Sequence, residues 1–310
     1  MGRSVYPAWF AGFACVAASA SVSDAEVTAP PAPKAVTGVS PKAMAHGGDA
    51  VGEAGRKVYQ RYCIGCHGEK GDGKGPAAKF LDPKPRDFTK GVFKFGAVPA
   101  GKLPTDDDLM RTVTNGLSAS SMPSWRLLPQ DQRWAVIQYL KSFSPRWKKD
   151  KPGPALSVPE DPFNEEPPSK LPSIRAQGEK IYHGRTTCWG CHPAYVPNDR
   201  VTSYVQAYGK SETPRAEMSK AEGKFSEPYE AIVMPPDFVK RRLKTGHSLE
   251  ALARVIWAGV GGTAMPTWKG QLKDDEFWAM VYYVRGLVEQ RLAKNKSVIP
   301  LPKYPQPKDR

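Results

Sequence analysis

The sequence contains little that would build a β-sheet or cross a bilayer. No stretch shows the alternation of apolar and polar residues typical of strands over a length comparable with its helical periods. The apolar run at residues 8–18 is shorter than the roughly 18 to 20 residues needed to span a membrane. Acidic residues are also scarce, since 31 aspartates and glutamates oppose 45 lysines and arginines, for a formal net charge of +14. The basic surface this predicts attracts acidic proteins, anionic membranes or nucleic acid by long-range electrostatics.

The first residues predict export from the cytoplasm. Arg3 precedes the apolar run and small residues follow it, which is the layout of a cleavable signal peptide over residues 1–25. Because residues 4–23 carry no charge, an uncleaved membrane anchor is the alternative. We therefore expect a periplasmic protein, either free or associated with the membrane through this segment or through a partner.

Proline-rich stretches divide the rest of the chain. Residues 26–49 read as a flexible leader, residues 144–173 as a linker with eight prolines, and residues 295–310 as a basic tail. These stretches bound two expected domains, residues 50–143 and residues 174–294.

The two expected domains form an internal repeat, here called the first repeat (residues 50–143) and the second repeat (residues 174–294). Corresponding segments occur in the same order, and the second repeat has two extra residues before its cysteine pair. The matches are GRKVYQRYCIGCH with GEKIYHGRTTCWGCH, LMRTVTNGLSASSMPSW with LARVIWAGVGGTAMPTW, and WAVIQYL with WAMVYYV.

These segments have helical periodicity. One apolar helix face is predicted near the C-terminus by Phe277, Met280, Val281, Val284, Leu287 and Val288. Ser248 is a predicted N-cap, and residues 105–108 (TDDD) resemble a capping box. The fold class expected from this pattern is all-α.

The motif CxxCH appears once in each repeat, and it is the attachment signature of a c-type haem. Two intervening residues let both thiols reach the two vinyl-derived carbons on one porphyrin edge, and the adjacent histidine then meets the iron. With five cysteines and five histidines in 310 residues, about one random chain in a thousand would contain even one match. Disulfides or zinc are the alternatives, but the two pairs lie 122 residues apart, far beyond the roughly 15 to 20 residues of zinc modules. The motif residues are Cys63, Cys66 and His67, and Cys188, Cys191 and His192.

Both repeats resemble class I cytochromes c, small helical domains that each enclose one covalently bound haem c. In that family a methionine beyond CxxCH, often followed by proline, is the sixth iron ligand, and Met122 and Met265 occupy this place. Core packing is the alternative role for either methionine, because a flexible thioether fills gaps well. Met234 also precedes a proline but lies upstream of that loop, and His183 is interpreted as a surface or cap residue.

The resemblance also implies supporting residues. Pro76 is expected to accept the ring N–H of His67 through its carbonyl, with Pro193 or Pro197 as substitutes in the second repeat. Trp125 and Trp268 are expected beside the haem or in its hydrophobic wall.

A haem ligated by histidine and methionine has no open coordination position, so the expected function is electron transfer rather than catalysis. The expected partners are acidic redox proteins or a membrane respiratory complex, with neither nucleic acid nor a small-molecule substrate. A haem-bearing subunit of a larger oxidoreductase and a dihaem cytochrome c peroxidase are the alternatives, and the two methionines argue against the peroxidase. The insertion at residues 202–228 shows no reliable helical period.

Overall fold

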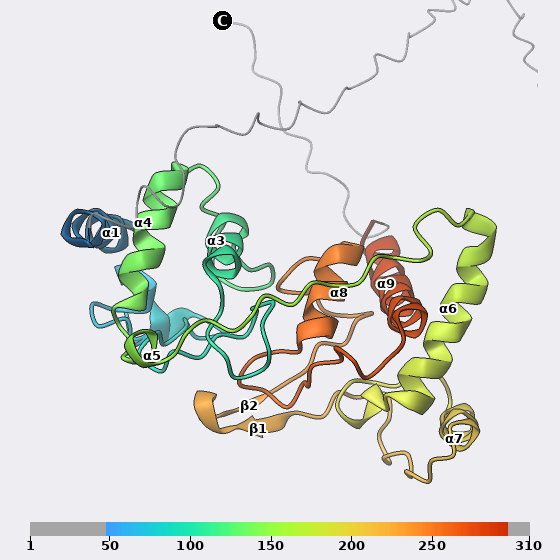
Figure 1. Cartoon of the computed structure of the whole chain (residues 1–310). Coiled ribbons are helices and arrows are strands. Elements are labelled where there is room, and N and C mark those ends of the chain that lie inside the picture. The colour runs from blue at the N-terminus through green and yellow to red at the C-terminus, as the bar shows by residue number, and fades with distance from the viewer. Residues whose placement is uncertain (1–47, 297–310) are drawn as a thin grey trace, which may run out of the picture. The chain divides into compact units, whose positions relative to one another are not determined.

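The computed structural model describes residues 48–296, and the side chains of residues 51–294. The expected signal peptide, nearly all of the expected leader and most of the basic tail lie outside the described residues. Across residues 48–296, no helix is both long and apolar enough to cross a membrane. Helices form the scaffold of this part of the chain (Figure 1), as the all-α prediction requires.

The first repeat is built from helices that pack in pairs. Helix α1 contacts α4, and α4 also contacts α3, while the short α2 carries the first CxxCH motif. The bounds are α1 Gly48–Tyr62, α2 Ile64–His67, η1 Ala78–Phe80, α3 Asp106–Asn115 and α4 Gln130–Lys141, and α5 Arg146–Lys149 follows in the linker.

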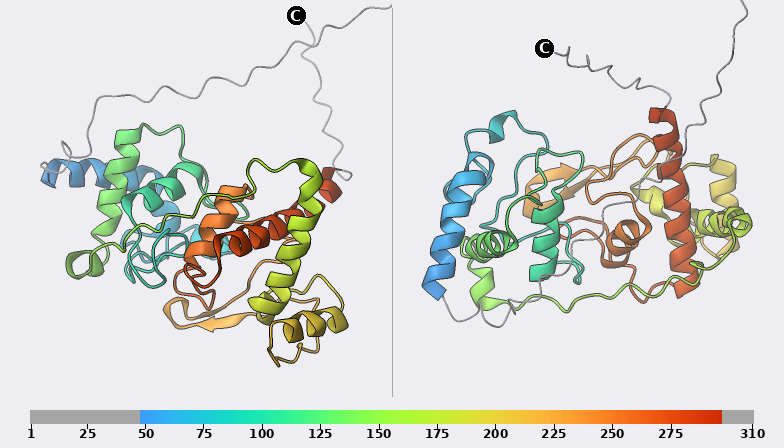
Figure 2. Two further views of the ribbon diagram at one scale, coloured as in Figure 1. Left: turned by 45° about the vertical axis from the view of Figure 1, so that its right-hand side comes forward. Right: turned by 90° about the horizontal axis from the view of Figure 1, so that it is seen from above.

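The second repeat pairs its helices in the same way (Figure 2), because α6 contacts α9 and α9 also contacts α8. It adds elements between its CxxCH motif and α8. The linker ends with η2 Pro168–Lys170 and the first residues of α6. The helix bounds of the second repeat are α6 Leu171–Lys180, η3 Ile181–Arg185, η4 Cys188–Gly190, α7 Asn198–Ala207, η5 Glu227–Tyr229, α8 Leu249–Ala258 and α9 Asp274–Lys296. The strands β1 Lys224–Ser226 and β2 Ala231–Val233 form a short antiparallel pair.

A glycine lies at the helix crossing in each repeat. A Cβ atom at Gly55 of α1 would collide with the carbonyl of Ala135 in α4. A Cβ atom at Gly178 of α6 would collide with the carbonyl of Ala279 in α9 in the same manner. The two glycines occupy equivalent positions in the repeat, and so do the two alanines. Both pairs of helices therefore cross at the same position of the repeat.

The predicted caps and the predicted apolar face are confirmed. The Thr105 side chain accepts a hydrogen bond from the amide of Asp108, whose carboxylate accepts one from the Thr105 amide, and this is a complete capping box. Ser248 caps α8 by accepting from the amide of Ala251 at 3.2 Å. The six residues predicted for one face of α9 are all buried.

The two extra residues of the second repeat are absorbed just before its cysteine pair. Helix α6 continues into η3, a π-helical turn, and Thr187 then adopts a left-handed conformation with φ of 46°. A π-turn accommodates additional residues within a helix. The helix can therefore keep its contact with α9 while its C-terminal end is longer than that of α1.

The part of the proline-rich linker between α5 and η2 is docked along the protein, and its residues 151–161 form an extended segment (Figure 1). The amides of Gly153 and Leu156 donate to the carbonyls of Leu103 and Ala97 in the first repeat, at 2.9 and 2.7 Å. Further along, the carbonyl of Pro159 accepts from the indole of Trp278 in α9 at 3.1 Å. The linker therefore bonds to both repeats.

The sequence interpretation missed regular structure around the insertion. Helix α7 covers the start of residues 202–228, and strand β1 lies near their end. Apolar residues of this region form a small separate core with Trp189, which includes Val201, Val205 and Met218. The helix was missed because only two residues of α7, Val201 and Val205, are buried.

Candidate functional site

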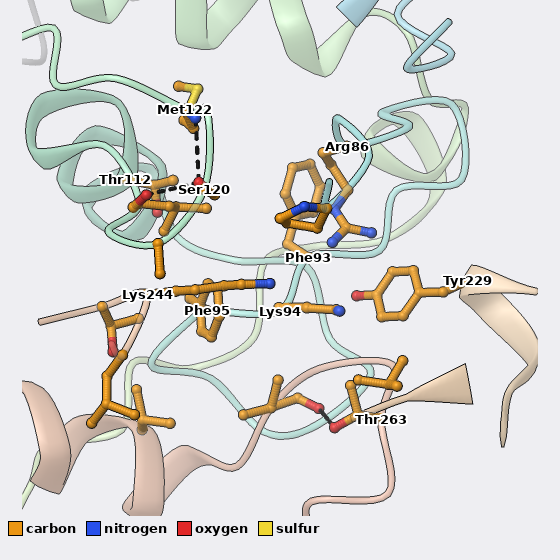
Figure 3. Close-up of a pocket in the computed structure, with 18 of the residues that line it drawn as sticks. Arg86, Phe93, Lys94, Phe95, Thr112, Ser120, Met122, Tyr229, Lys244 and Thr263 are labelled. Atoms are coloured by element: carbon orange, nitrogen blue, oxygen red, sulfur yellow. Dashed lines mark hydrogen bonds between the residues drawn. The ribbon is translucent and has the colours of Figure 1, made fainter. Parts of the chain in front are cut away.

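All of the candidate site residues line a single cavity of about 1480 Å³. This volume exceeds the roughly 300 to 1000 Å³ of an ordinary small-molecule pocket. Part of it is drawn in Figure 3. The sequence-predicted residues that line it are Cys63, Cys66, His67 and Met122 of the first repeat and Cys188, Cys191, His192 and Met265 of the second.

Each CxxCH motif is wound into one helical turn. The amide of His67 donates to the carbonyl of Cys63 at 2.9 Å, and the amide of His192 donates to the carbonyl of Cys188 at the same distance. The four cysteines are not in disulfides. Burial raises the pKa of the Cys63 thiol to about 12 and that of the Cys188 thiol to about 11, so both are neutral thiols at pH 7.

Both motif histidines are oriented by a main-chain carbonyl. The Nδ1 atom of His67 lies 3.0 Å from the carbonyl oxygen of Arg86, and the Nδ1 atom of His192 lies 3.0 Å from that of Pro236. A carbonyl only accepts, so Nδ1 carries the proton and donates in both cases. Burial lowers the pKa of both imidazoles, which favours their neutral form. The Nε2 atom therefore keeps a free lone pair for a metal.

The expectation that Pro76 orients His67 is wrong, and so is the expectation for Pro193 or Pro197. The acceptors come from the segments DPKPRDF and VMPPDF, which align with each other in the repeat. In both segments the acceptor is followed by Asp-Phe, and that phenylalanine stacks on the imidazole. The ring centroids of His67 and Phe88 lie 4.5 Å apart, and those of His192 and Phe238 lie 4.8 Å apart. The shared Asp-Phe was the available sequence signal for this support.

The two methionine loops have the same internal hydrogen bonds. The Ser120 hydroxyl accepts from the amide of Met122 at 3.2 Å, and the Thr263 hydroxyl accepts from the amide of Met265 at 3.2 Å. The carbonyl of each methionine accepts from the amide five residues before it, at 3.0 Å in the first repeat and 3.2 Å in the second. Each loop begins at a glycine with positive φ, Gly116 at 65° and Gly259 at 76°. Two different sequences therefore give one loop shape around the methionine.

The tryptophans three residues beyond the methionines also line the cavity. The amide of Trp125 donates to the carbonyl of Val113 at 3.1 Å, and the amide of Trp268 donates to that of Trp257 at 3.1 Å. These bonds tie the end of each loop back to α3 or α8. Both side chains form part of the wall, which is one of the two roles expected for them.

His183 is not a surface residue, contrary to the sequence interpretation. It is fully buried, and its Nδ1 atom donates to the carbonyl of Glu179 at 2.8 Å. Its own carbonyl accepts from the indole of Trp189 at 2.8 Å. The residue therefore joins the end of α6 to the second CxxCH turn, and it does not line the cavity.

The two repeats meet through equivalent loops. The amide of Gly261, in the second methionine loop, donates to the carbonyl of Lys94 at 3.0 Å. The amide of Ser118, in the first methionine loop, donates to the carbonyl of Lys244 at 2.9 Å. Ser118 and Gly261 are equivalent in the repeat, and so are Lys94 and Lys244. The contact is reciprocal, as in the isologous interface of a symmetric dimer.

Comparison with known proteins agrees with this geometry. The family model for cytochrome c oxidase, cbb3-type, subunit III matches residues 50–140 and 175–284, which together exceed half of the chain. The chain belongs to this family of c-type cytochromes. A solved structure of the Kuenenia stuttgartiensis reducing HAO-like protein complex Kustc0457/Kustc0458 is similar, with a TM-score of 0.61 and 34% sequence identity over 76% of this chain and 96% of that chain. No curated protein matches the chain.

Membership in a c-type cytochrome family means that the protein binds haem c covalently. The residues of the cavity fit this group. Free cysteines in a CxxCH turn are available for thioether bonds, and an imidazole whose Nδ1 is bonded to a carbonyl presents Nε2 to iron. The methionine thioethers on the cavity wall are soft ligands that suit haem iron.

Proposed function

We propose that this cytochrome transfers electrons through two covalently attached haems, one in each repeat. The observation that carries the proposal is the duplication of the site, since both repeats hold a histidine, a stacked phenylalanine and a methionine loop by equivalent contacts. The proposed thioether residues are Cys63, Cys66, Cys188 and Cys191, and the proposed iron ligands are His67, Met122, His192 and Met265.

The residues of the chain position the ligands and exclude other chemistry. The carbonyls of Arg86 and Pro236 fix the imidazole tautomer and ring direction. The methionine loops are closed by internal hydrogen bonds, which hold the thioethers at the wall of the cavity. When bound, haem iron would supply one-electron redox chemistry, and a histidine and a methionine ligand would leave no coordination position for a substrate. These features suit outer-sphere electron transfer.

We further propose that the protein works in the periplasm with protein redox partners. The net charge of +14 favours fast, salt-sensitive association with acidic redox proteins. Two findings support a place as a subunit of a membrane respiratory complex or another oxidoreductase. The matching family is described as an oxidase subunit, and the similar solved structure comes from a protein complex. Nucleic acid and small-molecule substrates are not proposed as partners.

A haem count and a redox titration test this proposal. The purified full chain should contain two haems, measured by the pyridine haemochrome assay. A spectroscopic redox titration should show two high-potential, low-spin haems that react with neither carbon monoxide nor hydrogen peroxide. One haem per chain would contradict the dihaem assignment, and a haem that binds carbon monoxide or reacts with peroxide would favour the peroxidase alternative.

Methionine substitutions test the proposed sixth ligands. Met122→Ala and Met265→Ala should each lower one midpoint potential and open one haem to carbon monoxide, because loss of the thioether frees a coordination position. Met234→Ala is the matched control, since Met234 also precedes a proline and lines the cavity. The control should retain both potentials and bind no carbon monoxide. Unchanged spectra in Met122→Ala and Met265→Ala would show that the ligands are misassigned.

A further inference from the structure

Three cationic side chains gather where the two repeats meet. Arg86 and Lys94 come from the first repeat and Lys244 from the second, and all three line the shared cavity. The guanidinium carbon of Arg86 lies 4.2 Å from the ring centroid of Tyr229, and the Nζ atom of Lys94 lies 4.6 Å from it. Figure 3 shows the three charged groups pointing into the same part of the cavity, beside Tyr229. They form what we call the junction cluster.

Among the described residues, no carboxylate lies within ion-pair distance of the junction cluster. Arg86, Lys94 and Lys244 make no ion pair with a carboxylate across residues 51–294, although other cations of the chain do. Burial lowers the pKa of Lys94 to about 8 and also lowers that of Lys244, and for both the charge of Arg86 acts in the same direction. The nearby Asp87 carboxylate already accepts two hydrogen bonds from Thr89. The carboxylates of Asp82 and Asp87 only partly offset the repulsion among these three half-buried charges, because the pKa of Lys244 and that of Arg86 are still lowered overall. An anion between the three cations would therefore be bound favourably.

The backbone fixes two of these cations with respect to both candidate haem sites. The carbonyl of Lys94 is bonded to the second methionine loop, and the carbonyl of Lys244 is bonded to the first. Each lysine therefore belongs to one repeat and is attached to the methionine loop of the other. An anion held by this cluster lies at the boundary of the two sites rather than within one of them.

The rest of the cavity restricts the chemistry of that anion. Its wall is largely apolar and includes Val92, Phe93 and Ile232. A ligand that fits must be a large apolar group with carboxylates at one edge, and haem is such a group, since its two propionates are its only peripheral charges. We propose that Arg86, Lys94 and Lys244 form one anion-binding site that holds propionate carboxylates of both haems. This inference rests on the proposed dihaem function.

The arrangement predicts that the two haems meet at their carboxylate edges. A cation beside a haem disfavours the additional positive charge of the oxidised iron, so it raises the midpoint potential. If the cluster is shared, removal of one lysine charge lowers both potentials. If each lysine serves only its own repeat, removal lowers one potential and leaves the other unchanged.

The experiment compares Lys94→Gln and Lys244→Gln with the unmodified full-length protein loaded with both haems. Because the main-chain carbonyls make the bonds across the junction, these substitutions leave those bonds intact. Each variant should shift both oxidation–reduction equilibria by about fivefold, roughly 40 mV lower for a one-electron couple at 59 mV per tenfold change. Lys94→Arg and Lys244→Arg should retain both potentials. Lys57→Gln on the exposed face of α1 removes the same charge away from the cavity and should shift neither.

The outcomes separate the inference from the function on which it rests. A count of two low-spin haems in the unmodified protein supports the function whatever the variants do. Unchanged potentials in both glutamine variants, or a shift of only one haem in each, would overturn the shared site. A repeat of the titration with added inorganic phosphate distinguishes a free anion from the propionates. Potentials that depend on phosphate in the unmodified protein, but not in the glutamine variants, would assign the cluster to a free anion and overturn the proposal.

Discussion

The two repeats form the same CxxCH turn, but different hydrogen-bond donors satisfy the main-chain carbonyls of that turn. In the first repeat, the carbonyls of His67 and Cys66 accept from the amides of Gly73 and Gly75, at 2.9 and 3.1 Å. These amides belong to the glycine-rich turn that directly follows the motif. The second repeat has no such turn, and its equivalent carbonyls need other donors.

Those donors come from the insertion. The guanidinium of Arg215 donates to the carbonyl of His192 at 3.0 Å and to that of Trp189 at 2.8 Å. The amide of Glu222 donates to the carbonyl of Cys191 at 2.7 Å. Equivalent carbonyls are therefore satisfied by a local turn in one repeat and by a distant segment in the other. The contacts that face the cavity are therefore the same in both repeats. The main-chain carbonyls on the other side of the turn need only a hydrogen-bond donor, whichever segment supplies it.

The largest expected effect is a loss of stability when the helix crossing that both repeats share is disrupted. Gly55→Ala and Gly178→Ala should each lower the free energy of unfolding by about 3 kcal/mol, because the added Cβ collides with a backbone carbonyl that cannot move away cheaply. Chemical denaturation followed by circular dichroism measures this. Gly52→Ala is the control in α1, where nothing lies within 4 Å, and it should be neutral or stabilising. Equal stability of Gly55→Ala and Gly52→Ala would show that the helices do not cross at Gly55.

A smaller loss of stability should be confined to the second repeat. Arg215→Ala removes donors from the carbonyls of Trp189 and His192, and leaving such groups unsatisfied should cost about 2 kcal/mol. Native-state hydrogen exchange resolves the two repeats and should show faster exchange around residues 188–192 with no change around residues 63–67. Arg200→Ala, at an exposed position on α7, is the control and should change neither. Equal acceleration in both repeats would contradict the separate support of the two turns.

The smallest expected effect is the loss of stability at the N-caps of α3 and α8, which differ between the two repeats. Thr105→Ala removes half of a capping box whose Asp108 also accepts from the amide of Ala97, so it should cost about 1.5 kcal/mol. Ser248→Ala removes a single cap bond and should cost about 1 kcal/mol. Thr105→Ser and Ser248→Thr keep the hydroxyl and should be close to neutral. Denaturant midpoints of the four variants give the order, and a larger loss for Ser248→Ala would contradict it.

The sequence predicted the features that depend on contiguous residues. The all-α class, the capping box at Thr105, the cap at Ser248 and the apolar face of α9 follow from local periodicity and hydrogen bonding. The repeat alignment also predicted two equivalent methionine loops, and the structure gives them the same bonds. The ligand roles of the cysteines, histidines and methionines stay predictions that the haem count and the titrations address.

The sequence could not predict contacts between distant segments. The acceptor for His67 lies 19 residues away and the acceptor for His192 lies 44 residues away, so nearby prolines were named instead. Burial of His183 was missed because a polar residue before the motif resembles a surface residue. The reciprocal bonds of Lys94 and Lys244 join residues of different repeats, and no local pattern marks them.

These reciprocal bonds have a consequence for how the chain assembles. A homodimer of single repeats could make the same pair of bonds, but it would dissociate on dilution. Here the docked linker places both halves on one polypeptide, so the effective concentration of each half for the other is fixed by the chain rather than by expression level. The junction between the repeats is therefore expected to be complete at any protein concentration, so its occupancy needs no second copy of the chain.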